Sequence, residues 1–149
     1  YHASSGDQWF GFNKVRALEG VSEDIVMIPL VGHTLGHSGV AVQFANRWYF
    51  QTGDAYFYHG EMNLAHPHCT PGLSFYQTMM EKDRANRLAN QDRLRNLKRM
   101  HADKVEIFCA HDVEEFEKLS GRSARIPITK TVRPLDGYRA HPDRSHFHF

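Results

Sequence analysis

The sequence has few cysteines and no long apolar segment, and its charges nearly cancel. Cys69 and Cys109 are the only cysteines among 149 residues, which argues against a disulfide scaffold and makes a reducing cytoplasm the expected location. No apolar run approaches the roughly 20 residues that span a bilayer. Lysine and arginine number 18 against 17 acidic residues, so electrostatics give no reason to expect binding to nucleic acid or to a membrane surface.

Histidine, by contrast, is abundant, with 11 residues. Metal binding would explain this number, and so would simple scatter, because several histidines fall in expected loops or near the end of the chain. These are His2, His59, His66, His68, His141, His146 and His148. Only the position of a histidine relative to strands and turns can separate the two explanations.

Apolar periodicity predicts several strands. Residues 25–31 form a continuous apolar run that is typical of a strand covered on both faces, and Pro29 within it indicates a sheet edge or a bulge. Residues 40–44 and 48–50 read as a hairpin, and residues 105–110 read as a later strand in which Cys109 is expected to be buried.

Two helical segments complete the pattern. One runs from residue 73 to about residue 101, either unbroken or broken once, and its arginine-rich face is expected to be solvated. The other runs from residue 113 to about residue 119, with Asp112 as the N-cap and Glu115 placed for a capping box. The order of these elements predicts an α/β fold with one sheet and helices on one side, whose other sheet face needs a cover.

Three short segments carry the candidate chemistry: residues 33–39 (H-T-L-G-H-S-G), Gly53-Asp54 and Ala110-His111-Asp112. Each lies next to a strand-like run, and Gly36 is expected to give the turn the backbone freedom that projects His37. A sheet could therefore gather His37, Asp54 and His111, whose imidazole and carboxylate groups are ligands for a zinc-like ion. Taken singly, each residue is more often a surface, capping or turn residue.

In this order, the three segments resemble the second half of the metallo-β-lactamase superfamily, over about residues 25–119. The resemblance implies a four-layer αββα sandwich with a site for two metal ions, usually zinc, with iron or manganese as alternatives. It also implies that His37 binds the first metal, that Asp54 bridges both ions and acts in catalysis, and that His111 binds the second.

The H-x-H-x-D-H motif of that family is absent. His66-Pro67-His68 has the first spacing but continues differently, and His146-Phe147-His148 ends the chain; both pairs are expected to be loop or tail histidines. The expectation is one partial domain over residues 1–149, with a core at about 25–119 and a tail at 120–149. It would be half of an αββα sandwich, with one mixed sheet and helices on its outer face. Its expected partner is a missing N-terminal half or a second copy.

The resemblance implies hydrolysis of an ester, lactone, thioester or amide bond in a small molecule by a metal-activated hydroxide. Lactonases of this family carry a tyrosine three residues after the aspartate, where this chain has Phe57. Tyr56 and Tyr58 flank it and are candidate substrate-binding residues, although packing of the site wall is an alternative. The chain alone is expected to have little or no activity. The alternatives are a half-domain that oligomerises and a metal-binding module that uses His37, Asp54 and His111 only.

Overall fold

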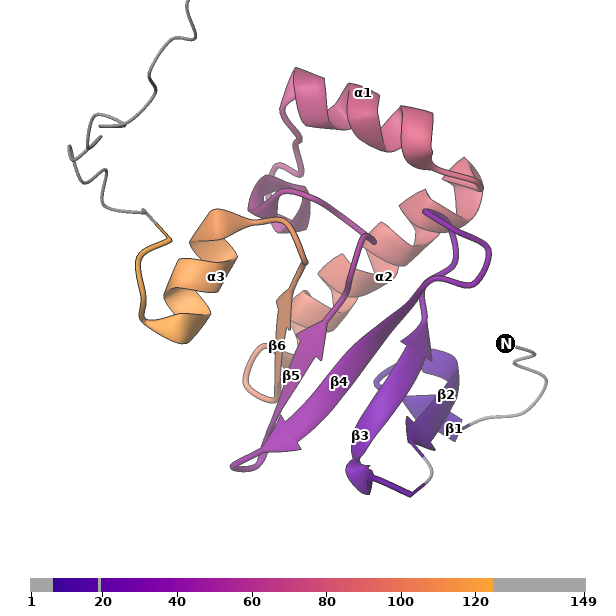
Figure 1. Ribbon diagram of the computed structural model, residues 1–149, viewed down its shortest axis with the longest axis vertical. Helices are drawn as coiled ribbons and strands as arrows, with labels where there is room; N and C mark the ends of the chain where they lie inside the picture. The colour runs from indigo at the N-terminus through magenta and orange to yellow at the C-terminus, as the bar shows by residue number, and fades with distance from the viewer. Residues whose placement is uncertain (1–6, 19, 125–149) are drawn as a thin grey trace, which may run out of the picture.

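The fold is built on one mixed sheet, which lies below α1 (Pro71–Met80) and α2 (Arg84–His101) in the view of Figure 1. The computed structural model describes residues 7–18 and 20–124. Six strands follow one another across the sheet in chain order; neighbours are antiparallel except for the last two, which are parallel. They are β1 (Asp7–Trp9), β2 (Phe12–Leu18), β3 (Ser22–Pro29), β4 (Ser38–Phe44), β5 (Arg47–Gln51) and β6 (Val105–Phe108). The structure confirms an α/β fold with a mixed sheet.

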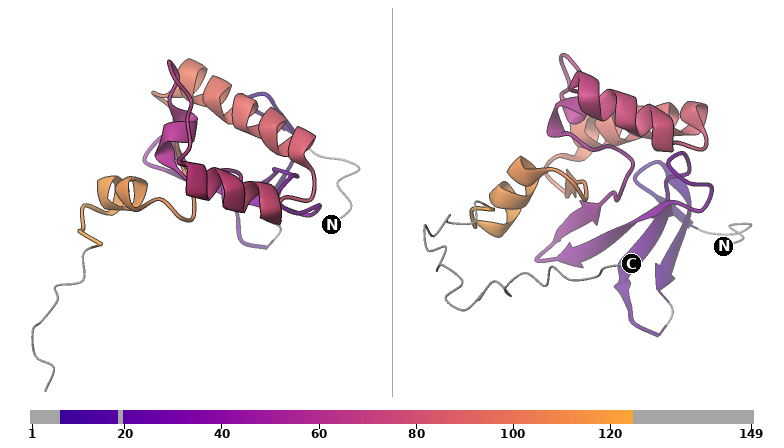
Figure 2. Two further views of the ribbon diagram at one scale, coloured as in Figure 1. Left: turned by 90° about the horizontal axis from the view of Figure 1, so that it is seen from above. Right: turned by 45° about the horizontal axis from the view of Figure 1, so that its top comes forward.

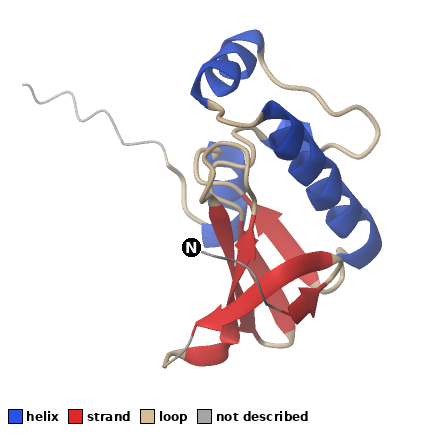
Figure 3. Cartoon of the chain, turned by 90° about the vertical axis from the view of Figure 1, so that its right-hand side faces the viewer, coloured by secondary structure: helices blue, strands red, loops and turns tan. Residues whose placement is uncertain are grey.

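The helices separate β5 from β6 in the sequence and follow β6. They are the short 3-10 helix η1 (His59–Met62), α1 (Pro71–Met80), α2 (Arg84–His101) and α3 (Val113–Ser120). Figure 1 and Figure 3 show α2 nearer to the sheet than α1, while α3 lies beside β6. No helix within the described ranges is both long and apolar enough to cross a membrane.

The long helix expected from residue 73 onward is broken once, between α1 and α2. A proline occupies the first turn of α1, where its missing N–H is not needed. The Asp83 side chain caps α2 by accepting a hydrogen bond from the Asn86 N–H. Figure 2 shows the two helices running beside each other when the molecule is seen from above.

The core lies between α2 and one face of the sheet. Leu94 and Leu97 of α2 are buried together with Ile28, Phe50 and other strand residues. Removing such apolar surface from water is the main favourable contribution to folding. Because α2 packs on the sheet in this way, β5 and β6 have a defined position relative to α2. The loops that follow these two strands are therefore also held in place.

Two features of the N-terminal region differ from the sequence-based expectations. β3 is an interior strand and not an edge strand. Pro29 is tolerated because it is the last residue of β3, and the described pairing with β2 already stops at Met27. Residues 7–18, which showed no strand pattern, form β1 and β2. Trp9 and Phe12 from these strands are buried in the core, where Trp9 packs edge-on against Phe50.

Candidate metal centre

The three predicted ligands lie at one edge of the sheet. His37 directly precedes β4, Asp54 follows β5, and His111 follows β6. Because β5 and β6 are parallel neighbours, the residues after them emerge at the same edge, where the antiparallel β4 begins. The register of the sheet thus brings together residues that are 17 and 57 positions apart in the sequence.

Asp54 is the centre of this group. Its Oδ1 lies 2.8 Å from His111 Nε2, and its Oδ2 lies 3.4 Å from His33 Nε2. The side chains of Asp54 and His111 are 31% and 57% exposed, so both are open to solvent. His33 was not among the predicted ligands, although its place four residues before His37 in the same turn was a usable signal.

The His37 ring contacts the backbone N–H of Asp54 and not its carboxylate. Its Nδ1 lies 2.8 Å from the Leu30 carbonyl oxygen, and its Nε2 accepts a hydrogen bond from the Asp54 N–H at 2.9 Å. A carbonyl oxygen only accepts, so the proton is assigned to Nδ1 and the lone pair to Nε2. That lone pair is the one a metal would use, and a metal would have to replace the Asp54 N–H to reach it.

The glycine that this arrangement requires is Gly53. Its φ is +59°, and a Cβ at this position would lie 2.6 Å from His37 Nε2. The expectation that Gly36 is needed to project His37 is wrong, because its φ lies outside the left-handed region and its Cβ position is open. The close approach of the Gly53 backbone to the imidazole therefore sets the turn.

The donor types present fit a zinc-like ion, which accepts imidazole nitrogen and carboxylate oxygen. However, no group of three or more histidine, cysteine, aspartate or glutamate residues in the described part of the chain is arranged to hold a metal. Asp54 and His111 face each other, whereas His37 faces the Asp54 amide. The residues thus fit part of a ligand shell, and their metal binding stays a prediction.

Aromatic side chains line the loop after Asp54. The Phe57 ring lies 5.9 Å from the His33 ring and 5.0 Å from the His111 ring, between centroids. Tyr56 is fully buried and its hydroxyl donates to the Glu115 carboxylate, which gives it a packing contact with α3. Tyr58 is half-buried beside His59, and its role in substrate binding stays a prediction.

Asp112 caps α3, as the sequence predicted. Its carboxylate accepts from the N–H groups of Glu115 and His59 and contacts the His59 ring. Burial opposes ionisation of Asp112, but these hydrogen bonds prevail and lower its pKa. Glu115 does not close a capping box; its carboxylate accepts from the Cys109 N–H, and burial raises its pKa.

The histidine pair of the His66-Pro67-His68 segment lies in an exposed loop. The Nδ1 of His68 contacts the His66 carbonyl oxygen at 3.0 Å, and its ring packs against Tyr58.

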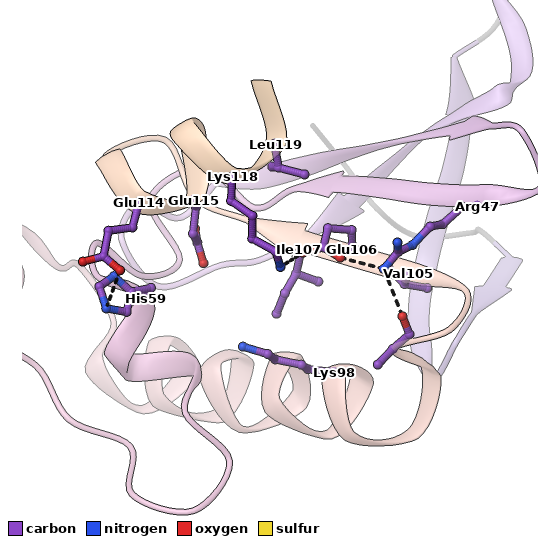
Figure 4. A pocket seen from close by; sticks show the side chains of 11 residues that line it. Arg47, His59, Lys98, Val105, Glu106, Ile107, Glu114, Glu115, Lys118 and Leu119 are labelled. Carbon is purple, nitrogen blue, oxygen red and sulfur yellow. Dashed lines mark hydrogen bonds and ion pairs between the residues drawn. The ribbon is translucent and has the colours of Figure 1, made fainter. Parts of the chain in front are cut away.

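A separate cavity of about 560 Å³ lies between α2 and α3 at the outer side of β6 (Figure 4). Lys98 and Lys118 reach toward it from the two helices, and Glu106 of β6 binds both Arg47 and Lys118. None of the predicted metal ligands lines this cavity.

No protein-family model matches the chain. Among curated proteins, it is 31% identical over 117 residues to a probable metallo-hydrolase of Mycobacterium tuberculosis and to one of Mycobacterium bovis. The aligned region covers 78% of this chain but 37% of each relative, so the chain spans little more than a third of their length.

Solved structures with a similar backbone include an N-acyl homoserine lactone hydrolase with N-hexanoyl-L-homoserine bound at its catalytic metal centre. They also include a quorum-quenching N-acyl homoserine lactone lactonase. Both are 19% identical with a TM-score of 0.47, and the match covers 70% of this chain and 36% and 38% of theirs. The sequence relationship to probable metallo-hydrolases, together with the ordered motifs, supports a relationship of this partial chain to the metallo-β-lactamase superfamily.

Proposed function

We propose that the chain is the C-terminal part of a metal-dependent hydrolase in which His37, Asp54 and His111 bind one side of a two-ion site. The observation that carries the proposal is the approach of Asp54 to His111, next to the His37 ring, at the edge where β5 and β6 end. The relationship to probable metallo-hydrolases supports the reaction class. Zinc is the proposed ion, and iron and manganese are the alternatives.

When bound, two such ions supply an activated water at neutral pH and polarise the carbonyl under attack. The chain's own residues orient the ligands. The Leu30 carbonyl holds the His37 ring through Nδ1 and so directs Nε2 toward the site. The two oxygens of Asp54 face different histidines, His111 and His33, so this carboxylate would have an oxygen available on each side to hold an ion and to orient a water.

The proposed substrate is a small molecule with an ester, lactone, thioester or amide bond. Phe57 occupies the position where lactonases of the family carry a tyrosine, and its ring packs edge-to-face against the His111 ring. Tyr58 is the remaining candidate for contact with the substrate. The cysteine content alone supports a cytoplasmic location.

The experiment uses the full-length parent protein. Metal analysis should give about two equivalents per chain, and His37→Ala or His111→Ala should abolish hydrolysis of ester and lactone probes. Full activity in both variants would overturn the proposal. We expect little or no turnover from the 149-residue chain alone, because it lacks the H-x-H-x-D-H motif that would complete the ligand set.

The sheet face opposite α2 favours a covering partner. Ile25 pairs with Val42, and Val42 pairs with Tyr49, so these side chains share one face. Ile25 and Tyr49 are half-buried, and Val42 is 39% exposed. We propose that the N-terminal half of the parent protein covers this face, as an αββα sandwich requires. The second candidate is a non-catalytic half-domain that pairs with a copy of itself, and a concentration-dependent dimer in light scattering would favour it.

A further inference from the structure

Glu61 is a buried carboxylate close to the candidate metal centre. It lies in η1, is 6% exposed, and is surrounded by N–H donors. Its Oε2 accepts from the backbone N–H groups of Phe57 (2.9 Å) and Tyr58 (3.1 Å) and from the Gln77 side-chain amide (2.9 Å). Its Oε1 accepts from the Gln91 side-chain amide at 3.0 Å. Burying a carboxylate is costly unless its oxygens are hydrogen-bonded, and here both are.

The carboxylate also fixes the direction of the neighbouring amides. Because the Gln77 nitrogen donates to Glu61, the Gln77 oxygen faces Arg87 Nη1 at 3.1 Å. Arg87 continues the network through its ion pair with Glu81. Gln91 donates to the Ala55 carbonyl oxygen with the same nitrogen that reaches Glu61. The acceptor-only group at position 61 therefore acts together with Arg87 and the Ala55 carbonyl to give these amides one orientation.

This hydrogen-bond network holds the loop that directly follows Asp54. The Ala55 carbonyl and the Phe57 and Tyr58 amides are all held by it. The held segment carries the Phe57 ring, which packs against His111, and His111 faces the Asp54 carboxylate at 2.8 Å. The contacts thus form a continuous path from Glu61 to the candidate ligands.

We propose that Glu61 is a positioning residue of the candidate metal centre. It clamps residues 55–58 and, through Phe57, sets the orientation of the His111 ring relative to Asp54. The metal-related part of this inference rests on the proposed function, whereas the clamp itself does not.

Glu61→Gln is the informative variant. It keeps the shape of the side chain but replaces one acceptor with an NH₂ donor, which meets a donor of Phe57, Tyr58, Gln77 or Gln91 whichever way it is turned. Glu81→Gln is the matched control. Glu81 has a side chain that is 7% exposed and belongs to the same network, but it bonds to Arg84 and Arg87 and not to the loop.

The first readout needs no metal. In the 149-residue chain, the Phe57 and Tyr58 amides of Glu61→Gln should exchange with solvent at least about tenfold faster, once the difference in global stability is subtracted. The ring ¹⁵N resonances of His111 should shift in Glu61→Gln and stay in place in Glu81→Gln. Unchanged loop amides and His111 resonances, or equal changes in both variants, would overturn the proposal.

The second readout is metal affinity, with Co²⁺ titrated into the same chain. Glu61→Gln should bind Co²⁺ about 10–100-fold more weakly than the parent chain, while Glu81→Gln stays within about threefold. Loss of binding in His111→Ala together with unchanged binding in Glu61→Gln would refute the positioning role. If His111→Ala binds Co²⁺ as the parent chain does, the proposed metal site fails, and the first readout still decides the role of Glu61.

Discussion

Replacing Gly53 with alanine tests the packing of the Asp54 turn against His37. The backbone has a φ of +59° at Gly53, and an added Cβ would lie 2.6 Å from His37 Nε2. The left-handed conformation costs an alanine about 1–2 kcal/mol. Displacement of the His37 ring by this Cβ also breaks the hydrogen bond from the Asp54 N–H to His37 Nε2, which contributes about 1 kcal/mol. Gly53→Ala should therefore lower the free energy of unfolding by about 2–3 kcal/mol.

Urea denaturation of the 149-residue chain measures this change, and two glycines provide controls. Gly121 has a φ of +65° with nothing within 4 Å of its Cβ position, so Gly121→Ala should show the backbone cost alone. Gly36 has neither the positive φ nor a close neighbour, so Gly36→Ala should change stability by less than about 0.5 kcal/mol. Equal losses in Gly53→Ala and Gly121→Ala would show that the contact with His37 does not exist.

Three further predictions concern the core, the N-cap of α3 and the thiols. Leu94→Ala, at a fully buried position, should lower the free energy of unfolding by about 2–5 kcal/mol. Met100→Ala, at a position 70% exposed, should change it by less than about 0.5 kcal/mol, and similar losses in the two would contradict the core assignment. Hydrogen bonds lower the pKa of Asp112 in the folded chain, so its stabilisation is complete above the usual aspartate pKa and is lost as the pH falls through the lowered value. Asp112→Asn should thus flatten the acid side of the stability–pH curve, and an unchanged curve would argue against the shift. Burial raises the pKa of Cys109 to about 12 and that of Cys69 to about 11, and Cys109 is the more buried of the two. Iodoacetamide at pH 8 should therefore label Cys69 first in peptide mapping, and faster labelling of Cys109 would contradict this order.

The strands β3 to β6 were predictable because their own residues carry the pattern. Continuous or alternating apolar residues mark them, and these signals are local. β1 and β2 were not predictable, because the apolar residues of 7–18 do not alternate regularly with polar ones, and Lys14 has a positive φ. They are strands because they pair with each other and with β3, for example Arg16 with Met27. Pairing of this kind depends on tertiary contacts that a local pattern does not record.

The candidate site, like the fold, was predictable from the sequence only in part. The sequence pointed to Asp54 and His111 because each follows a predicted strand, and Asp54 also follows a glycine. Turns at the ends of neighbouring strands lie at the same edge of the sheet. The sequence could not show that the His37 ring faces the Asp54 amide, because that depends on the φ of Gly53. Nor could it reveal the role of Glu61, whose partners on α1 and α2 lie 16 and 30 positions further along the chain.

The most direct test of the proposed metal centre is a crystal structure of the zinc-loaded parent protein with anomalous difference maps. The proposal predicts two peaks, one about 2.0–2.1 Å from His37 Nε2 and one at that distance from a ring nitrogen of His111, with Asp54 oxygens about 2.0–2.2 Å from both. The Asp54 N–H should then no longer bond to His37. Peaks located elsewhere, or a fully loaded protein in which His37 still accepts from the Asp54 amide, would contradict it.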